Sequence, residues 1–249
     1  MCAWIALYLT LASADRLLEA TVREAAMSSP EWWEAHHQLA KLKPGTSWFG
    51  PIGRAIARDI AKRYYTRSCA LGDAVVLGSG FSKTPYWLAR TGAFRRVYGI
   101  DSSISAVRAM SRYAKALDHG GRGWDIVRYV RADLTRPGQF RSNASLVLDE
   151  GVLDVLQAGP GIDARQVMNA YVERAAGLVR QGGALIVVGY AGNPAVVNQT
   201  TLELSCWTRS GFLGLDALGA DPRRACSPWG PGAYVLTRRR VADDRAKIV

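Results

Sequence analysis

Short apolar runs rich in β-branched residues alternate with helix-length segments over the middle of the chain. The runs are residues 74–77, 97–100, 126–130, 144–148 and 184–188. Alternation of strands and helices is typical of a mostly parallel sheet whose connections are right-handed crossovers. The last run is continuously apolar, as in a strand covered on both faces. The pattern therefore predicts an α/β fold with helices on both faces of the sheet.

The connections and the end of the sheet follow from the same pattern. Helices are expected through Tyr86–Leu88, through Val107 and Met110, and over 166–180, where Gly182 and Gly183 would end the last one. Residues 201–207 and 233–239 have no helix-length segment between them. We therefore expect them to pair as a closing antiparallel hairpin, which gives the sheet an antiparallel last strand.

The beginning of the chain predicts additional helices. Ser28-Ser29-Pro30-Glu31 is a helix start, with a hydroxyl N-cap, a proline in the first turn and an early carboxylate. That helix would end before Pro44-Gly45, and Ile52, Ile56 and Ile60 lie at the spacing of a second helix. We expect residues 1–27 to be a leader or a capping helix and residues 28–249 to form one domain.

Composition excludes several classes of protein. Half of the residues (49%) are hydrophobic, so a large core is available, and the longest apolar stretch, residues 3–14, is too short to cross a bilayer. The net charge of +11 favours acidic partners or reflects a basic solvated surface. Since no block of five like charges occurs, we expect no stable nucleic-acid binding. Four cysteines without a C-x-x-C pair and three histidines predict neither a metal site nor a disulfide framework.

Distinctive polar residues follow four of the predicted strands. Gly78-Ser79-Gly80 comes after the first, Asp101 ends the second, Asp133 follows the third, and Asp149-Glu150 ends the fourth. Ligands of open parallel sheets bind beyond these carboxyl ends. Glycines let the backbone approach the ligand, and carboxylates at these ends suit a ribose, a purine amine and a cationic centre.

The ligand that fits this set best is S-adenosylmethionine. A dinucleotide site of the G-x-G-x-x-G type would need a glycine where Lys83 stands, so a nicotinamide oxidoreductase is disfavoured. S-adenosylmethionine has a ribose, an adenine and a positive centre but no pyrophosphate. Carboxylates and aromatic faces stabilise its sulfonium and ammonium groups.

Three segments carry a resemblance to a known family. Residues 75–80 followed by Gly99-Ile100-Asp101-Ser102 resemble the class I (seven-stranded) S-adenosylmethionine-dependent methyltransferases. Residues 148–154, Leu-Asp-Glu-Gly-Val-Leu-Asp, resemble the D-K-G-T-[LW]-D signature of the methyltransferase-like protein-lysine methyltransferases of citrate synthase and elongation factor 1A. Trp32-Trp33 through His37 and Trp48-Phe49-Gly50 match that group's upstream Y-W-x-x-x-Y and W-[FY]-G motifs in order.

The resemblance implies a Rossmann-like, seven-stranded fold and a role for each matching residue. Trp33, His37 and Trp48 would wall the methionine end of the cofactor. The rest of the cofactor would be bound by the turn and strand-end residues Gly78, Ser79, Gly80, Asp101, Ser102, Asp133 and Leu134. Asp149 and Glu150 would line the mouth of the active site, where Asp149 and Asp154 would orient the acceptor amine. His37, Ser79 and Glu150 depart from the family's usual tyrosine, cysteine and lysine.

The substrate and location are the least constrained expectations. The resemblance implies a protein substrate, citrate synthase before elongation factor 1A, and hence a mitochondrial location, with the cytoplasm as the alternative. A small-molecule or nucleic-acid methyltransferase and a non-catalytic scaffold that binds the cofactor stay open. The N/D-P-P-[YFW] motif of adenine methylation is absent after the fourth strand, where Asp149-Glu150-Gly151-Val152 stands.

Overall fold

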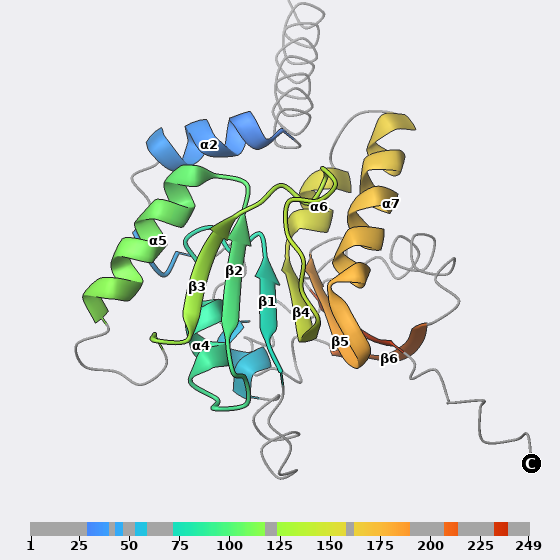
Figure 1. Cartoon of the computed structure of the whole chain (residues 1–249). Helices are drawn as coiled ribbons and strands as arrows, with labels where there is room; N and C mark the ends of the chain where they lie inside the picture. The colour runs from blue at the N-terminus through green and yellow to red at the C-terminus, as the bar shows by residue number, and fades with distance from the viewer. Residues whose placement is uncertain are drawn as a thin grey trace, which may run out of the picture.

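The computed structural model describes residues 29–39, 43–46, 53–58, 72–117, 124–157, 162–189, 207–213 and 232–238. These residues form a twisted central sheet flanked by helices (Figure 1). No helix among them is long and apolar enough to cross a membrane. The predicted leader (1–27), Trp48, Ile52 and Ile60 lie outside the described residues.

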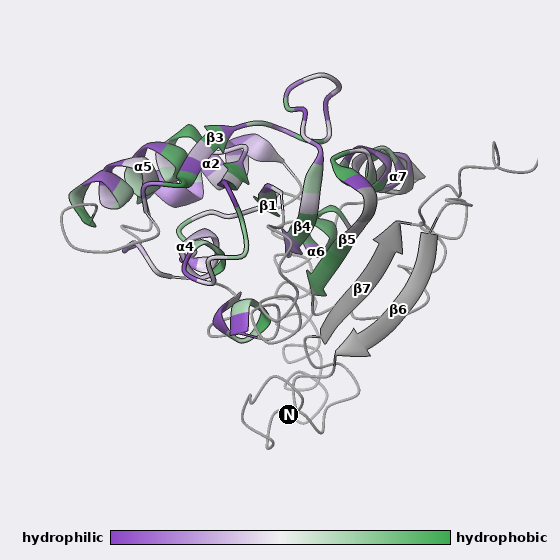
Figure 2. Ribbon diagram, turned by 60° about the horizontal axis from the view of Figure 1, so that its bottom comes forward, coloured by the Kyte–Doolittle hydropathy of each residue, from purple (hydrophilic) through white to green (hydrophobic). Residues whose placement is uncertain are grey.

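Seven strands form one sheet in the order β3-β2-β1-β4-β5-β7-β6. Their bounds are Ala74–Leu77 (β1), Val97–Asp101 (β2), Val127–Arg131 (β3), Ala144–Glu150 (β4), Val179–Gly189 (β5), Trp207–Leu213 (β6) and Gly232–Arg238 (β7). Strands β1 to β5 pair in parallel, whereas β7 pairs antiparallel with both β5 and β6. Figure 2 shows β7 between β5 and β6. The predicted mostly parallel sheet with an antiparallel last strand is confirmed.

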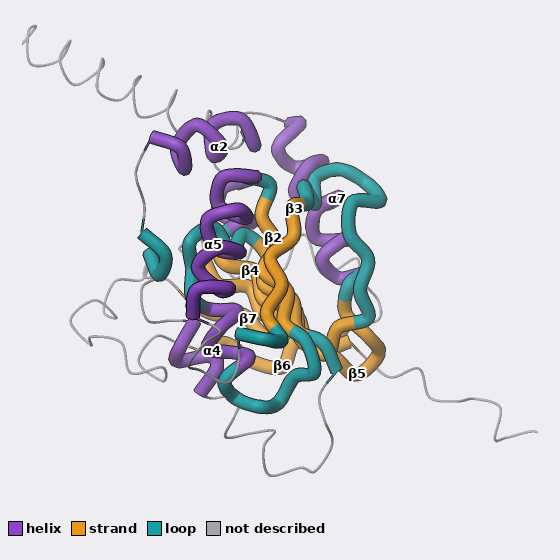
Figure 3. The backbone as a smooth tube through the Cα atoms, turned by 60° about the vertical axis from the view of Figure 1, so that its left-hand side comes forward, coloured by secondary structure: helices purple, strands orange, loops and turns teal. Residues whose placement is uncertain are grey.

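Helices cover both faces of the sheet (Figure 3). Their bounds are Pro30–Leu39 (α2), Thr84–Ala89 (α4), Ile104–Leu117 (α5), Val152–Gln157 (α6) and Ile162–Gly177 (α7), and residues 53–58 form a further short helix. Helices α2, α4 and α5 lie on one side and α7 on the other. The order of the sheet changes direction between β1 and β4, and in such sheets this is the point at which a crevice opens.

Alternation along β1 builds two cores, one on each face. Ala74 and Val76 pack with residues of α4 and α5, such as Leu88 and Ala114. Val75 and Leu77 point to the opposite face and join a cluster from α6 and α7 that includes Tyr171. All four β1 residues are buried, as expected for a strand with period-two side chains and helices on both sides.

Three boundaries differ from the sequence prediction. Helix α7 ends at Gly177, and Gly182 and Gly183 lie inside β5 instead of ending that helix. The pairing of β4 with β5 shifts register between Ala144 and Leu146, and a Cβ on Gly183 would lie 2.9 Å from the backbone oxygen of Ser145. This glycine thus permits close approach of the two strands at a bulge. The sequence predicts a strand over 201–207, but β6 spans Trp207–Leu213, so the two share only Trp207, and residues 201–206 lie outside the described residues.

Helix α2 begins where the sequence predicts. The Ser29 hydroxyl oxygen accepts a hydrogen bond from the backbone N–H of Trp32, 3.1 Å away, which satisfies one of the free N–H groups of the first turn. Pro30 opens the helix, where the lack of a backbone N–H costs nothing. The capping pattern therefore fixes the start of the helix that carries Trp33 and His37.

Candidate functional site

The turn after β1 is built from two glycines with left-handed backbone. Gly78 has φ 66° and Gly80 has φ 42°, a region that side chains with a Cβ rarely adopt. A Cβ on Gly78 would lie 2.4 Å from a methyl carbon of Val152 and 3.3 Å from the backbone oxygen of Glu150. The turn therefore passes close to the end of β4, which no side chain at position 78 would allow.

Asp101, at the end of β2, is hydrogen-bonded to this turn. Its Oδ2 accepts a hydrogen bond from the backbone N–H of Gly80 and its Oδ1 accepts one from that of Ser103, both at 2.8 Å. Burial raises the pKa of Asp101 to about 6, although both hydrogen bonds act in the opposite direction. The carboxylate is thus held in a fixed orientation beside the glycine turn, in an environment where an added hydroxyl donor would be strongly bound.

His37 of α2 lies over the same turn. Its Nε2 is 3.8 Å from the position that a Cβ on Gly80 would take, and its ring packs against those of Phe81 and Trp33, with centroids 5.3 and 5.6 Å away. Burial lowers the pKa of His37 to about 4, so the imidazole is neutral at neutral pH. Its Nδ1 is buried and has no hydrogen-bond partner among the described residues.

Glu150 and the residues after the turn form a polar group next to this site. The Ser82 hydroxyl donates a hydrogen bond to Oε1 of Glu150 at 2.9 Å, and it lies 2.8 Å from the hydroxyl of Thr84. Ser82 also accepts a hydrogen bond from the backbone N–H of Thr84. The glutamate that ends β4 is therefore linked to the start of α4.

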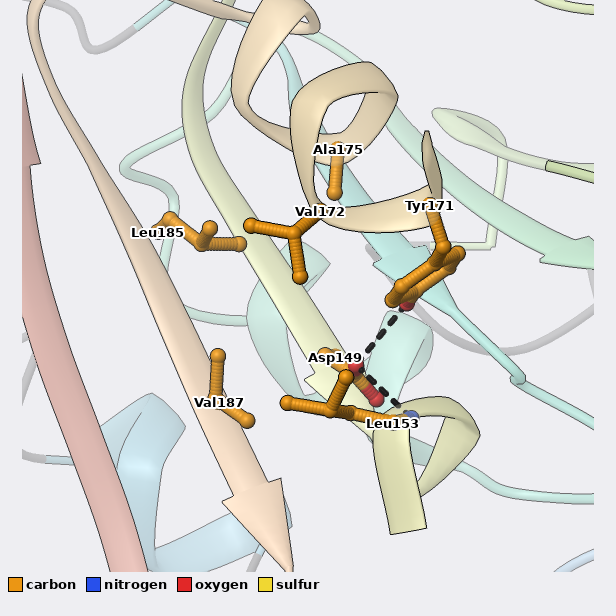
Figure 4. Close-up of a pocket in the computed structure, with 7 residues that line it drawn as sticks. All are labelled: Asp149, Leu153, Tyr171, Val172, Ala175, Leu185 and Val187. Carbon is orange, nitrogen blue, oxygen red and sulfur yellow. Dashed lines mark hydrogen bonds between the residues drawn. The ribbon is translucent and has the colours of Figure 1, made fainter. Parts of the chain in front are cut away.

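Asp149 faces away from this group. Its carboxylate accepts hydrogen bonds from the Tyr171 hydroxyl at 2.8 Å and from the backbone N–H groups of Val152 and Leu153 at 2.7 and 3.2 Å. Together with apolar residues of α7 and β5 it lines a small pocket (Figure 4). Burial raises the pKa of Asp149 to about 7, against the effect of the bond from Tyr171. The sequence places this carboxylate at the mouth of the site; the structure places it between β4, α6 and α7.

The remaining predicted site residues lie around the strand ends. Asp133 accepts hydrogen bonds from the backbone N–H and hydroxyl of Thr135 and forms an ion pair with Arg136. Leu134 is buried in the core on the α7 face. Ser102 follows Asp101, and Asp154 lies in the first turn of α6. The backbone N–H of Asp133 also donates a hydrogen bond to Oε1 of Gln139 at 2.7 Å, so the contacts of Asp133 are made with residues 135–139.

Two residues that the sequence analysis did not single out join the parts of the site. Ser103 caps α5, since its hydroxyl oxygen accepts the backbone N–H of Ala106, and Glu34 of α2 accepts the hydroxyl hydrogen of Ser103. Serine is a preferred N-cap residue, and Ser103 directly precedes α5, so the sequence does contain a signal for this cap. The partner of Glu34 is 69 residues away, and no local pattern points to it. Among the described residues no group of histidine, cysteine or carboxylate side chains is arranged to hold a metal ion.

No protein-family model and no curated protein matches the sequence. Solved structures match in fold. The CcbJ methyltransferase from Streptomyces caelestis gives a TM-score of 0.56 at 15% identity and covers 76% of this chain and 90% of that one. An S-adenosylmethionine-dependent methyltransferase from Clostridium acetobutylicum gives a TM-score of 0.54 at 8% identity. The match covers 83% of this chain and 97% of that one. Magnesium protoporphyrin IX methyltransferase (ChlM) from Synechocystis PCC 6803, solved with S-adenosylmethionine bound, gives a TM-score of 0.52 at 16% identity. The match covers 75% of this chain and 80% of that one. The chain thus has the fold of class I S-adenosylmethionine-dependent methyltransferases.

Proposed function

We propose that this protein is an S-adenosylmethionine-dependent methyltransferase. The observation that carries the proposal is the bond between Asp101 and the glycine turn. Gly80 donates its backbone N–H to the Asp101 carboxylate where β1 and β2 end side by side. In an open α/β sheet, ligands bind outside the carboxyl ends of the strands, next to the point where the strand order changes direction, and β1 lies at that point here.

The residues present fit the nucleoside and the cationic methionine end of this cofactor. A Cβ on Gly80 would lie 3.8 Å from Nε2 of His37 and 3.9 Å from Oδ2 of Asp101, so both polar groups lie next to the same turn residue. A carboxylate there suits the two hydroxyls of a ribose. The neutral imidazole of His37 offers a hydrogen-bonding group. The ring of Trp33 offers an aromatic face, which attracts a cation. When bound, S-adenosylmethionine would supply an activated methyl group on its sulfonium.

The work of the chain in such a reaction is alignment and exclusion of water. Asp101 would fix the ribose, and the turn 78–80 would fix the depth at which the nucleoside binds. Helix α2 would cover the site with Trp33 and His37, which removes water from the line between acceptor and methyl carbon. None of these residues needs to move a proton, which agrees with the low pKa of His37.

The acceptor predicted from the sequence is a protein lysine, because residues 148–154 resemble the signature of that group. A lysine acceptor must lose its proton first, and a carboxylate at the opening would hold the amine. Glu150 ends β4 and is hydrogen-bonded to Ser82 after the glycine turn, whereas Asp149 is bonded to Tyr171 and the start of α6, so we assign this task to Glu150. The second candidate is a small-molecule acceptor, which is supported by the fold's likeness to ChlM, whose name gives magnesium protoporphyrin IX as its substrate.

Transfer of a labelled methyl group distinguishes these acceptors. The protein is incubated with methyl-labelled S-adenosylmethionine and, in separate reactions, unmethylated citrate synthase, elongation factor 1A and a small-molecule extract. Label on a lysine, located by mass spectrometry, supports the protein acceptor and, if the acceptor is citrate synthase, a mitochondrial role. Label in the extract alone supports the small-molecule acceptor. The Asp101→Ala variant is the control and should transfer no label; transfer by this variant at the wild-type rate would contradict the proposed site.

A further inference from the structure

The carboxylate of Glu34 hydrogen-bonds helix α2 to the beginning of α5. Oε2 of Glu34 accepts hydrogen bonds from the Ser103 hydroxyl at 2.8 Å and from the backbone N–H of Ser105 at 3.2 Å, and Oε1 accepts one from the Ser105 hydroxyl at 2.5 Å. Oε1 also accepts the side-chain amide N–H of Gln38, one turn further along α2. Both oxygens of Glu34 are therefore fully used, and three of the four bonds come from the first turn of α5.

The electrostatics of this contact favour the ionised carboxylate. Burial alone would raise the pKa of Glu34, but the hydrogen bonds from Ser105 and Ser103 outweigh it and lower the pKa to about 2. The backbone N–H groups at the beginning of α5, a helix of 14 residues, carry partial positive charge that attracts the anion. The contact thus persists over the whole physiological pH range.

A short chain of hydrogen bonds connects Glu34 to the proposed ribose site. Ser103 donates its hydroxyl to Glu34 and its backbone N–H to Oδ1 of Asp101, whose Oδ2 accepts the N–H of Gly80. His37, three residues after Glu34, faces Gly80 from above. Figure 1 shows α2 across the end of α5, beside the carboxyl ends of β2 and β1. The position of α2 and the orientation of Asp101 are therefore set through the same serine.

We propose that Glu34 is a positioning residue of the cofactor site: it fixes α2, and with it His37, over the turn 78–80, and so controls how slowly the cofactor leaves. The inference rests on the proposed function, since it needs a nucleoside bound between that turn and α2. Glu34 itself touches Ser103, Ser105 and Gln38, so its effect is transmitted through α2 and Ser103.

The test compares Glu34→Ala with Glu31→Ala, which removes an exposed glutamate of the same helix. S-adenosylhomocysteine is the probe, and its dissociation rate is measured by stopped-flow fluorescence. We expect Glu34→Ala to dissociate about tenfold faster than the wild type, because hydrogen bonds to a charged group are lost. Glu34→Gln, which keeps one carbonyl oxygen, should lie between the two, and Glu31→Ala should match the wild type.

Two further readouts separate positioning from folding. In the free protein, hydrogen exchange of the α2 amides should become faster in Glu34→Ala while that of β1 and β4 is unchanged. In steady-state kinetics, KM for the cofactor should rise by about tenfold in Glu34→Ala, and kcat should change by a smaller factor than KM does. Equal dissociation rates in wild type and Glu34→Ala, or an equal increase in Glu31→Ala, would overturn the inference and leave the proposed function standing. A wild-type protein that binds no S-adenosylhomocysteine would overturn both.

Discussion

The hydroxyl of Tyr171 donates a hydrogen bond to the carboxylate of Asp149 at 2.8 Å, and both side chains are at most 2% exposed. The bond joins the middle of α7 to the end of β4. The same carboxylate accepts the backbone N–H groups of Val152 and Leu153, which begin α6. Asp149 thus supports the strand end that carries Glu150 and approaches the glycine turn.

Loss of the tyrosine hydroxyl should destabilise the fold. Tyr171→Phe removes one of three donors to a buried carboxylate, and we expect the free energy of unfolding to fall by about 1–3 kcal/mol. The measurement is urea unfolding followed by circular dichroism. The matched control is Tyr86→Phe, whose hydroxyl accepts a bond from exposed Arg90 and should change stability by less than about 0.5 kcal/mol. Equal effects of the two variants would mean that the buried bond contributes nothing specific.

Stability should fall as pH rises toward neutrality because of Asp149. Its pKa is about 7 in the folded protein, against 3.8 as the ordinary value, so the folded chain binds more protons than the unfolded chain between these pH values. The free energy of unfolding therefore decreases with rising pH in this window, by at most about 1.4 kcal/mol per pH unit for this carboxyl. Asp101, with its pKa of about 6, contributes with the same sign over a narrower range.

The Asn variant isolates this contribution. Asp149→Asn removes the titrating group and keeps an oxygen for Tyr171. Urea unfolding at several pH values between 4.5 and 7.5 should show the variant gaining stability relative to the wild type as the pH rises. Parallel pH profiles for the two proteins would show that Asp149 does not titrate in this range.

The strands and the glycine turn could be predicted from the sequence. The run at 74–77 is followed by Gly78 and Gly80, and both the strand and the positive φ angles are where apolar residues and glycines indicate. The direction of the Asp149 side chain could not be predicted, because it depends on Tyr171, 22 residues further along, and on the start of α6. The sequence pattern predicts a carboxylate at the end of β4, but it does not predict which residue hydrogen-bonds to that carboxylate.

Two other features also depend on distant partners. The end of α7 was expected at Gly182 and Gly183, but these glycines serve the bulge between β4 and β5, a property of strand pairing that local spacing does not reveal. The hydrogen bonds of Glu34 are made with the first turn of α5, and only the folded chain brings that turn to α2.

Space and backbone conformation at the turn are tested by two glycine variants. Gly78→Ala combines a left-handed backbone with a Cβ 2.4 Å from Val152, whereas Gly138→Ala combines a φ of 77° with open space. Gly138→Ala should cost about 1 kcal/mol of stability from backbone strain alone. Gly78→Ala should cost clearly more and also weaken S-adenosylhomocysteine binding. A Gly78→Ala protein as stable as Gly138→Ala would contradict the close packing at this turn.

Calorimetric titration with S-adenosylhomocysteine tests whether the Asp101 carboxylate beside the turn 78–80 binds the ribose of the cofactor. We expect saturable one-to-one binding to the wild type. Binding to Asp101→Asn should be at least about tenfold weaker, since charge-assisted hydrogen bonds to the ribose hydroxyls are lost. The affinity of the wild type should decrease as the pH falls below about 6, where Asp101 becomes protonated. Wild-type protein that releases no heat of binding, or an Asp101→Asn variant that binds as tightly as the wild type, would contradict this role of Asp101.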